Sequence, residues 1–329
     1  MTELLETVTG APAPSAPKRK SRRGVVEWLT VALALVIYGS WLLLVFYHAF
    51  VPNWLLLLLG GIVIAWHSSF QHEVVHGHPT RYKKINHAFG FLPLSLWLPF
   101  PLYASTHKNH HVDERLTDPL DDPESKYLTD EQWQKWSPIA RLIEKAQSPL
   151  LGRMIIGPVW MIGKFMLGEL LKILRGDHSS LRMWLLHWLT VSVVLFWVIG
   201  ISGMSLESYI VFFVYPGTAI LMLRSFAEHR AAEKASHRTA IIEEASLLGL
   251  IFLNNNLHAV HHSRPALPWY ELPEYYRTNR EHFLNENAGL MYRGYGDVIA
   301  KYLFRSHDQV IHPLLEKTGQ SRVLGKSDV

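Results

Sequence analysis

Four stretches of the chain are long, apolar and free or nearly free of charged residues. They are Trp28–Tyr47, Trp54–Phe70, Met183–Ile201 and Tyr209–Phe226. About 20 residues at 1.5 Å per residue make a helix of about 30 Å, which matches the hydrocarbon core of a bilayer. Short links without Lys or Arg join the first stretch to the second and the third to the fourth. The pattern therefore predicts four transmembrane helices arranged as two hairpins.

Two further apolar stretches do not fit a simple span. Ala88–Tyr103 contains three prolines, which interrupt a helix, so we expect a broken, re-entrant or interfacial segment. Met154–Leu174 carries Lys164, Glu169 and Lys172 within its apolar pattern. We interpret it as an amphipathic helix that lies on the membrane surface.

Charge orients the predicted hairpins. The basic patch KRKSRR at residues 18–23 directly precedes the first span, which indicates an anionic membrane surface rather than nucleic acid as its partner. The positive-inside rule then places the N-terminus, residues 71–182 and residues 227–329 on the cytosolic side. We expect a multi-pass, all-α integral membrane protein with four transmembrane helices in two hairpins, a cytosolic His-rich helical cap, and both termini in the cytosol.

Composition restricts the chemistry that the chain can perform. Of its 329 residues 49% are hydrophobic, and the net charge is +4. The chain has no cysteine, which excludes disulfides, cysteine-ligated zinc and iron–sulfur clusters. A metal bound by this chain must therefore be held by His, Asp or Glu.

Histidines gather in three clusters. HEVVH at residues 72–76 fits the H-E-x-x-H pattern of zinc metalloproteases, in which the glutamate, here Glu73, is the general base. HKNHH and HAVHH repeat a second pattern, H-x-x-H-H, whose spacings bring imidazoles together on one helix face. One more histidine directly follows the fourth span. The candidate metal ligands are His72, His76, His107, His110, His111, His229, His258, His261 and His262.

Nine imidazoles are too many for one metal ion. Two ions with four or five ligands each would use them all, and imidazole suits Zn, Cu, Fe and Ni. A dinuclear iron centre is the economical interpretation, because iron can also activate O2 by redox change; two zinc or two copper ions stay open on composition alone.

These clusters, in this order between paired spans, resemble the membrane fatty acid desaturase/hydroxylase superfamily over about residues 28–280. The resemblance implies a non-haem diiron centre, O2 as co-substrate, and the eight histidines of the three boxes as ligands, with His229 as an additional ligand. It also implies a separate electron donor of the ferredoxin, rubredoxin or cytochrome b5 type. We expect three parts: a disordered basic tail (residues 1–25), a membrane desaturase-like domain (26–285) and a cytosolic C-terminal tail (286–329).

Other residues refine this resemblance. Acyl-CoA desaturases carry an asparagine one turn before the additional histidine, where this chain has Ser225. The segment NNNLHAVHHSRPALPWYELP is more similar to acyl-lipid desaturases, carotenoid ketolases and lipid hydroxylases. Asp118, Asp121 and Asp122 either orient histidines of the second box or form a solvated turn. Asn254, Asn255 and Asn256 are either supporting donors or a helix cap, and Glu73 is expected to orient a ligand imidazole.

We therefore predict a membrane diiron oxygenase that uses O2 to desaturate a fatty acyl chain of a lipid, with its active site on the cytosolic side. Hydroxylation or ketolation of a membrane lipid is the first alternative, because the same chemistry serves both outcomes. An intramembrane zinc metalloprotease built on HEVVH is the second.

Overall fold

A computed structural model describes residues 26–315, and the predicted disordered tail at residues 1–25 lies outside this range. The described chain is mostly helical. The helices before the last predicted span are α1 (Trp28–Phe46), α2 (Asn53–Val75), α3 (Lys83–Gly90), α4 (Phe100–His110), α5 (Asp130–Lys135), α6 (Pro138–Ala146), α7 (Leu150–Ile155), α8 (Gly157–Leu174) and α9 (His178–Leu195). The remaining elements are α10 (Leu206–Tyr209), α11 (Tyr215–Phe226), β1 (Ile241–Glu244), α12 (Ser246–Ile251), α13 (His258–Ser263), α14 (Leu272–Glu286), β2 (Met291–Gly294) and α15 (Tyr295–Tyr302).

Four helices are long and apolar enough to cross a membrane, as the sequence predicts. They cover Trp28–Phe46, Asn53–Val75, His178–Ile201 and Leu206–Phe226, where short π-helical turns extend α9 and join α10 to α11. The second runs five residues beyond the predicted end, so that His72 lies on the same helix as the apolar stretch. The third begins earlier than predicted because the Asp177 side chain accepts hydrogen bonds from Ser179 N and Ser180 N and caps the helix.

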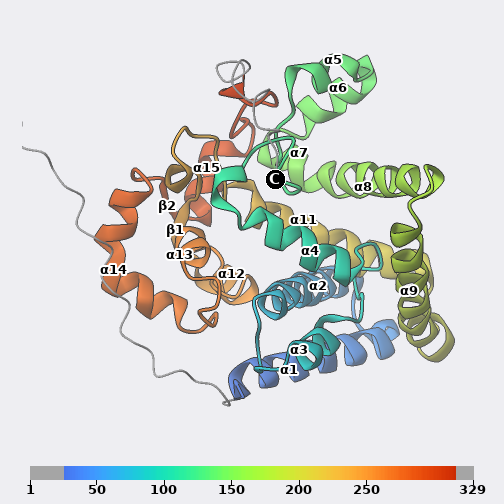
Figure 1. Cartoon of the computed structure of the whole chain (residues 1–329). Helices are drawn as coiled ribbons and strands as arrows, with labels where there is room; N and C mark the ends of the chain where they lie inside the picture. Colours follow the sequence, from blue (N-terminus) through green and yellow to red (C-terminus); the bar gives the residue numbers. More distant parts are fainter. Residues whose placement is uncertain (1–25, 316–329) are drawn as a thin grey trace, which may run out of the picture.

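Small residues let α2 and α11 cross closely. A Cβ on Gly217 would lie 2.5 Å from Ile64 Cβ, and a Cβ on Gly61 would lie 2.9 Å from Pro216 Cβ. Close approach at glycine is typical of helix pairs in membranes, where packing rather than the hydrophobic effect drives association. Figure 1 shows this helix pair at the centre of the molecule, with α12–α15 and both strands gathered at one end of it.

The segment at Ala88–Tyr103 is broken, as the prolines predict. Helix α3 ends at Gly90, α4 begins at Phe100, and the residues between them form no long helix. Polar side chains of the spans donate hydrogen bonds to its backbone carbonyls: Tyr209 Oη donates to Leu94 O at 2.7 Å, and His187 Nε2 donates to Leu96 O at 2.9 Å. Buried irregular backbone requires such partners, which explains the polar His187 within a helix that is apolar enough to cross a membrane.

The expectation of an all-α protein is wrong in one detail. Strands β1 and β2 form a two-stranded parallel sheet in which Ile241 pairs with Met291 and Glu244 with Gly294. Each strand has four residues, too short for an alternating pattern to be recognised in the sequence.

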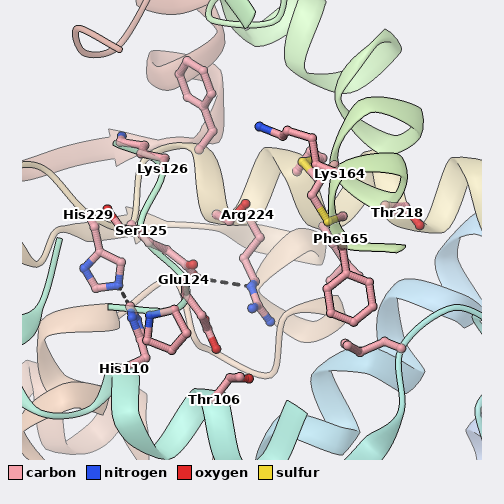
Figure 2. Close-up of a pocket in the computed structure, with 18 of the residues that line it drawn as sticks. Thr106, His110, Glu124, Ser125, Lys126, Lys164, Phe165, Thr218, Arg224 and His229 are labelled. Carbon is pink, nitrogen blue, oxygen red and sulfur yellow. Dashed lines mark hydrogen bonds and ion pairs between the residues drawn. The ribbon is translucent and has the colours of Figure 1, made fainter. Parts of the chain in front are cut away.

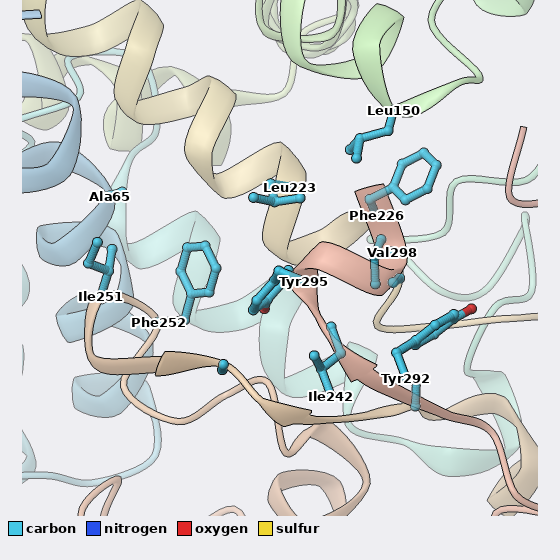
Figure 3. Close-up of a cluster of buried hydrophobic side chains, with 13 residues drawn as sticks. Ala65, Leu150, Leu223, Phe226, Ile242, Ile251, Phe252, Tyr292, Tyr295 and Val298 are labelled. Carbon is cyan, nitrogen blue, oxygen red and sulfur yellow. The ribbon is translucent and has the colours of Figure 1, made fainter. Parts of the chain in front are cut away.

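The sheet belongs to the largest buried apolar cluster, which joins α2, α7, α11, α12 and α15 (Figure 3). Tyr292, Tyr295 and Val298 contribute to it from residues 286–315, the described part of the predicted C-terminal tail. This cluster fixes the last span relative to the segments that carry the third histidine box.

Candidate metal centre

All nine candidate histidines converge. Two come from the end of α2, three from the end of α4, one follows α11, and three lie on α13. They form two sets, in each of which one ligand atom per residue lies within 4.8 Å of all the others. The first histidine group contains His72, His76, His107, His111 and His261. The second histidine group contains His110, His229, His258 and His262.

The ring nitrogens face one another in both groups. In the first, His76 Nε2 and His111 Nε2 lie 3.0 and 3.1 Å from His107 Nε2, and His261 Nε2 lies 3.1 Å from His111 Nε2. In the second, His229 Nε2 lies 3.0 Å from His110 Nε2 and 2.9 Å from His258 Nε2 (Figure 2). Metal–imidazole bonds of about 2.0–2.1 Å put opposite ligand atoms about 4.2 Å apart, so both groups are close to the size of a coordination shell.

Acceptors behind the rings decide which nitrogen faces inward. Glu124 Oε1 lies 3.0 Å from His107 Nδ1, and Asp122 Oδ1 lies 2.9 Å from His110 Nδ1. A carboxylate accepts only, so Nδ1 carries the proton and Nε2 presents its lone pair to the centre. Such carboxylate–histidine pairs hold the tautomer and ring orientation at metal sites.

The second group repeats this arrangement with neutral acceptors. His229 Nδ1 donates to Arg238 O at 3.3 Å, and His258 Nδ1 donates to Asn255 Oδ1 at 3.2 Å. The Asn255 amide is oriented in turn, because its Nδ2 donates to Glu228 Oε1 at 2.9 Å. Both rings therefore point bare Nε2 atoms at each other across 2.9 Å, which is favourable only with a cation between them.

Burial disfavours a proton as the cation between these two nitrogens. Burial, together with neighbouring imidazoles, lowers the pKa of His229 and His258 well below the ordinary value. The same causes lower the pKa of His76, His261 and His262. Neutral imidazole is the form that binds metal, so the environment of both groups fits metal ions.

Unsatisfied ring nitrogens support the same conclusion. Among the described residues, neither of the buried ring nitrogens of half-buried His262 has a hydrogen-bond partner, and His72 Nε2 has none either. Buried polar atoms are nearly always paired, so each of these nitrogens requires an explanation. A metal ion in each group would satisfy His72 Nε2 and one of the two ring nitrogens of His262.

The carboxylate in contact with the first group stays ionised. Burial raises the pKa of Glu124, but the charge and hydrogen bond of His107 outweigh it and lower that pKa to about 2. For His110, burial lowers the pKa, and the hydrogen bond to Asp122 with the charges of Glu124 and Glu228 raises it above the ordinary value. The acidic segment thus contributes negative charge directly behind the imidazoles.

The structure separates the supporting residues that the sequence left open. Asp122 orients a histidine, whereas Asp118 forms a turn by accepting from Leu120 N at 2.8 Å. Asn255 supports His258, whereas Asn254 Nδ2 donates to Trp269 O and Asn256 Nδ2 to Ile242 O.

Two glutamates differ from expectation. Glu73 was expected to orient a ligand imidazole, but its Oε2 accepts a hydrogen bond from Trp269 N at 3.2 Å. Glu124 was not predicted at all, although it lies in the same acidic run as Asp122. Glu124 follows His107 by 17 residues in the sequence, and this separation is too long for a helix or strand pattern to link the two residues.

A cavity of about 480 Å³ opens beside the second group. His110, His229 and His258 line one part of it, and apolar side chains such as Trp97, Leu102, Phe165 and Met222 line others. Figure 2 shows His110 and His229 at one side, Arg224 in the middle, and Phe165 and Thr218 at the opposite side. A substrate in this cavity would lie beside three of the four histidines of the second group.

Comparison with known proteins agrees with this site. The family model described as fatty acid desaturase matches residues 49–295, a range that contains all nine histidines of both groups. A search among curated proteins found no match to the chain.

Proposed function

Because the chain belongs to the fatty acid desaturase family, within the membrane desaturase/hydroxylase superfamily, we propose that it is an O2-dependent diiron oxidoreductase that desaturates a lipid acyl chain. One observation carries the proposal: nine buried or half-buried imidazoles from four segments form one group of five and one of four. Five ligands and four ligands suit two metal ions, whereas a zinc protease needs three or four protein ligands in all.

The two groups would hold one iron ion each. Bound there, the iron pair would supply the activation of O2 and the oxidation of an unactivated C–H bond. In the overall reaction, one O2 and two electrons with two protons remove two hydrogen atoms from adjacent carbons, giving a carbon–carbon double bond and two molecules of water. Asp122, Glu124 and Asn255 fix the imidazoles, so that ligand geometry is set before substrate binds.

The cavity would bind the reacting part of the substrate. Its apolar side chains Trp97, Leu102 and Phe165 suit a hydrocarbon chain that would lie beside the second histidine group. Hydroxylation and ketolation use the same site and oxidant, so the alternative differs only in whether an oxygen atom enters the product.

The four apolar helices support an integral membrane location. We propose that they form two hairpins whose links face away from the cytosol, and that a helical cap carrying the metal centre lies on the cytosolic face. The basic residues of 71–182 and 227–329 support this orientation.

Electrons would come from a separate protein. The chain contains no cysteine, so it cannot hold an iron–sulfur or rubredoxin centre of its own. We propose a ferredoxin, rubredoxin or cytochrome b5 type donor that docks on the cytosolic side.

Metal analysis and lipid profiling test the proposal together. Two iron ions per chain, and lipids that lose two hydrogen atoms in an O2-dependent manner, are the expected results. A product that gains one oxygen atom would assign the hydroxylase alternative, and one zinc ion per chain with no lipid change would refute the oxygenase. His261→Ala should abolish the change, whereas His178→Ala, at an exposed site at the start of α9, serves as the matched control.

A further inference from the structure

The cavity beside the second histidine group is lined by charged as well as apolar side chains. Three of its cations have carboxylate partners. Arg224 Nε lies 3.2 Å from Glu228 Oε1, Lys164 Nζ lies 2.9 Å from Glu144 Oε2, and Lys126 Nζ lies 2.8 Å from Asp308 Oδ2. The charges of these residues are therefore compensated within the protein.

Arg153 is the exception. It lines the same cavity from α7, and among the described residues its guanidinium has no ion pair within 4.0 Å and its buried Nε has no hydrogen-bond partner. Burial lowers the pKa of Arg153 below its ordinary value, and the charge of Glu144 only partly opposes this shift. A guanidinium stays protonated in proteins, so a positive charge faces the cavity without a direct partner.

The acidic residue closest to Arg153 in sequence, Glu144, already accepts three hydrogen bonds from other side chains. Glu144 Oε2 accepts hydrogen bonds from Lys164 and from Trp160 Nε1 at 2.6 Å, and Glu144 Oε1 accepts from Gln147 Nε2. These bonds hold Glu144 toward α8 and leave the donors of Arg153 for another acceptor. Arg153 is half-buried, so an anion bound in the cavity would accept charge-assisted hydrogen bonds from its guanidinium without displacing a partner among the described residues.

The cavity connects this cation with the second histidine group. Arg153 and His229 line the same space, and Met222 and Phe165 provide an apolar wall in it. An amphiphile with an anionic end at Arg153 would therefore place its hydrocarbon chain along that wall and beside the imidazoles.

We propose that Arg153 binds the anionic group of the substrate, so that the substrate is an anionic lipid rather than a neutral one. This inference rests on the proposed function, because it names the substrate class of that site. The fork of guanidinium donors matches both carboxylate and phosphate. The anion is therefore either the carboxylate of an unesterified fatty acid or the phosphate of a phospholipid.

Equilibrium binding tests the assignment. The probes are stearic acid, distearoyl phosphatidic acid and stearyl alcohol, and the protein is the full-length, iron-loaded chain without an electron donor, so that no turnover occurs. Arg153→Gln should weaken binding of the anionic probe about 10- to 100-fold, as expected for a hydrogen bond to a charged group, and leave stearyl alcohol unchanged. Arg153→Lys should restore part of the affinity.

The two anionic probes distinguish carboxylate from phosphate. The probe whose binding weakens in Arg153→Gln carries the anionic group that Arg153 binds. Arg175→Gln removes the same charge at an exposed site at the end of α8 and is the matched control. Equal affinity of wild type for stearyl alcohol and for both anionic probes would overturn the inference. Equal weakening of all three probes by Arg153→Gln would also overturn it, since that result indicates a structural role.

Iron content and O2-dependent product formation are measured on the same samples with a donor added. A protein that oxidises lipid but shows no Arg153-dependent anion binding refutes this inference and leaves the proposed function intact. A protein that binds anions through Arg153 but never oxidises lipid refutes the proposed function alone.

Discussion

The three hydrogen bonds of Asp122 allow a quantitative test of how the second histidine group is held. Its Oδ1 accepts from His110 Nδ1 and from Glu124 N, and its Oδ2 accepts from Thr117 N, each at 2.9 Å. Asp122→Asn keeps the size of the side chain but turns one oxygen into an NH2 group. Whichever way the amide is placed, a donor then faces a donor.

The loss can be expressed as metal affinity. A hydrogen bond to a charged group is worth about 1.5–3 kcal/mol, and loss of a residue that supports a ligand imidazole typically lowers metal affinity about 10- to 100-fold. The two figures agree, since each factor of ten corresponds to about 1.4 kcal/mol. Only the second group contains His110, so Asp122→Asn should release one of the two proposed iron ions at about 10- to 100-fold lower chelator concentration than wild type.

Iron content measured across a chelator series provides the assay. Asp118→Asn is the matched control, because Asp118 accepts from Leu120 N and Asp121 N within the same loop. Retention of both irons by Asp122→Asn at the wild-type chelator concentration would contradict the reasoning. Equal loss in the Asp118 variant would show that loop stability, not the orientation of His110, controls the metal.

Two further predictions concern stability. Gly217→Ala should lower the thermal unfolding temperature and the iron content, because its Cβ would lie 2.5 Å from Ile64 Cβ and overpacking costs about 1–3 kcal/mol. Gly163→Ala, whose Cβ would meet no atom within 4 Å, should lower neither. Burial raises the pKa of Asp308, but His307 and Lys126 outweigh it and lower that pKa below its unfolded value. Its stabilisation is therefore full above pH about 4 and is lost as pH falls further, so Asp308→Asn should unfold at a lower temperature than wild type near neutral pH. The difference between the two proteins in a fluorescence unfolding assay should shrink in acid, and a constant difference would refute the assignment.

The sequence predicts the spans and the histidine boxes well, because both depend on spacing along one helix. It does not predict which acidic residue supports which histidine. Asp122 and Glu124 lie in a segment without regular periodicity, where Thr117 adopts a positive φ of 69° and the loop returns to α4. The path of such a loop depends on tertiary hydrogen bonds that no local pattern encodes.

Side chains that form hydrogen bonds to segments far away in the sequence are equally hard to predict. Trp41 Nε1 donates to Tyr209 Oη at 2.9 Å, and Tyr209 Oη donates to Leu94 O, so two spans and the broken segment share one chain of hydrogen bonds. Trp41 and Tyr209 lie 168 residues apart in the sequence, and Tyr209 and Leu94 lie 115 residues apart. In the sequence these residues are indistinguishable from other aromatic residues of an apolar span.

Helix geometry explains why nine histidines divide into five and four. At about 100° per residue, positions i and i+4 lie about 40° apart, whereas i+3 lies about 60° to the other side. Each H-x-x-H-H pattern thus provides a pair on one side and a single histidine on the other. On α4 the pair is His107 and His111; on α13 it is His258 and His262.

The two helices are placed so that the pair of one meets the single histidine of the other. His261 joins the α4 pair in the first group, and His110 joins the α13 pair in the second. The α2 histidines then complete the first group, and His229 after α11 completes the second. Because α4 and α13 each contribute to both groups, a shift of either helix changes both sets of ligands at once. The packing that fixes these helices therefore couples the geometry of the two histidine groups.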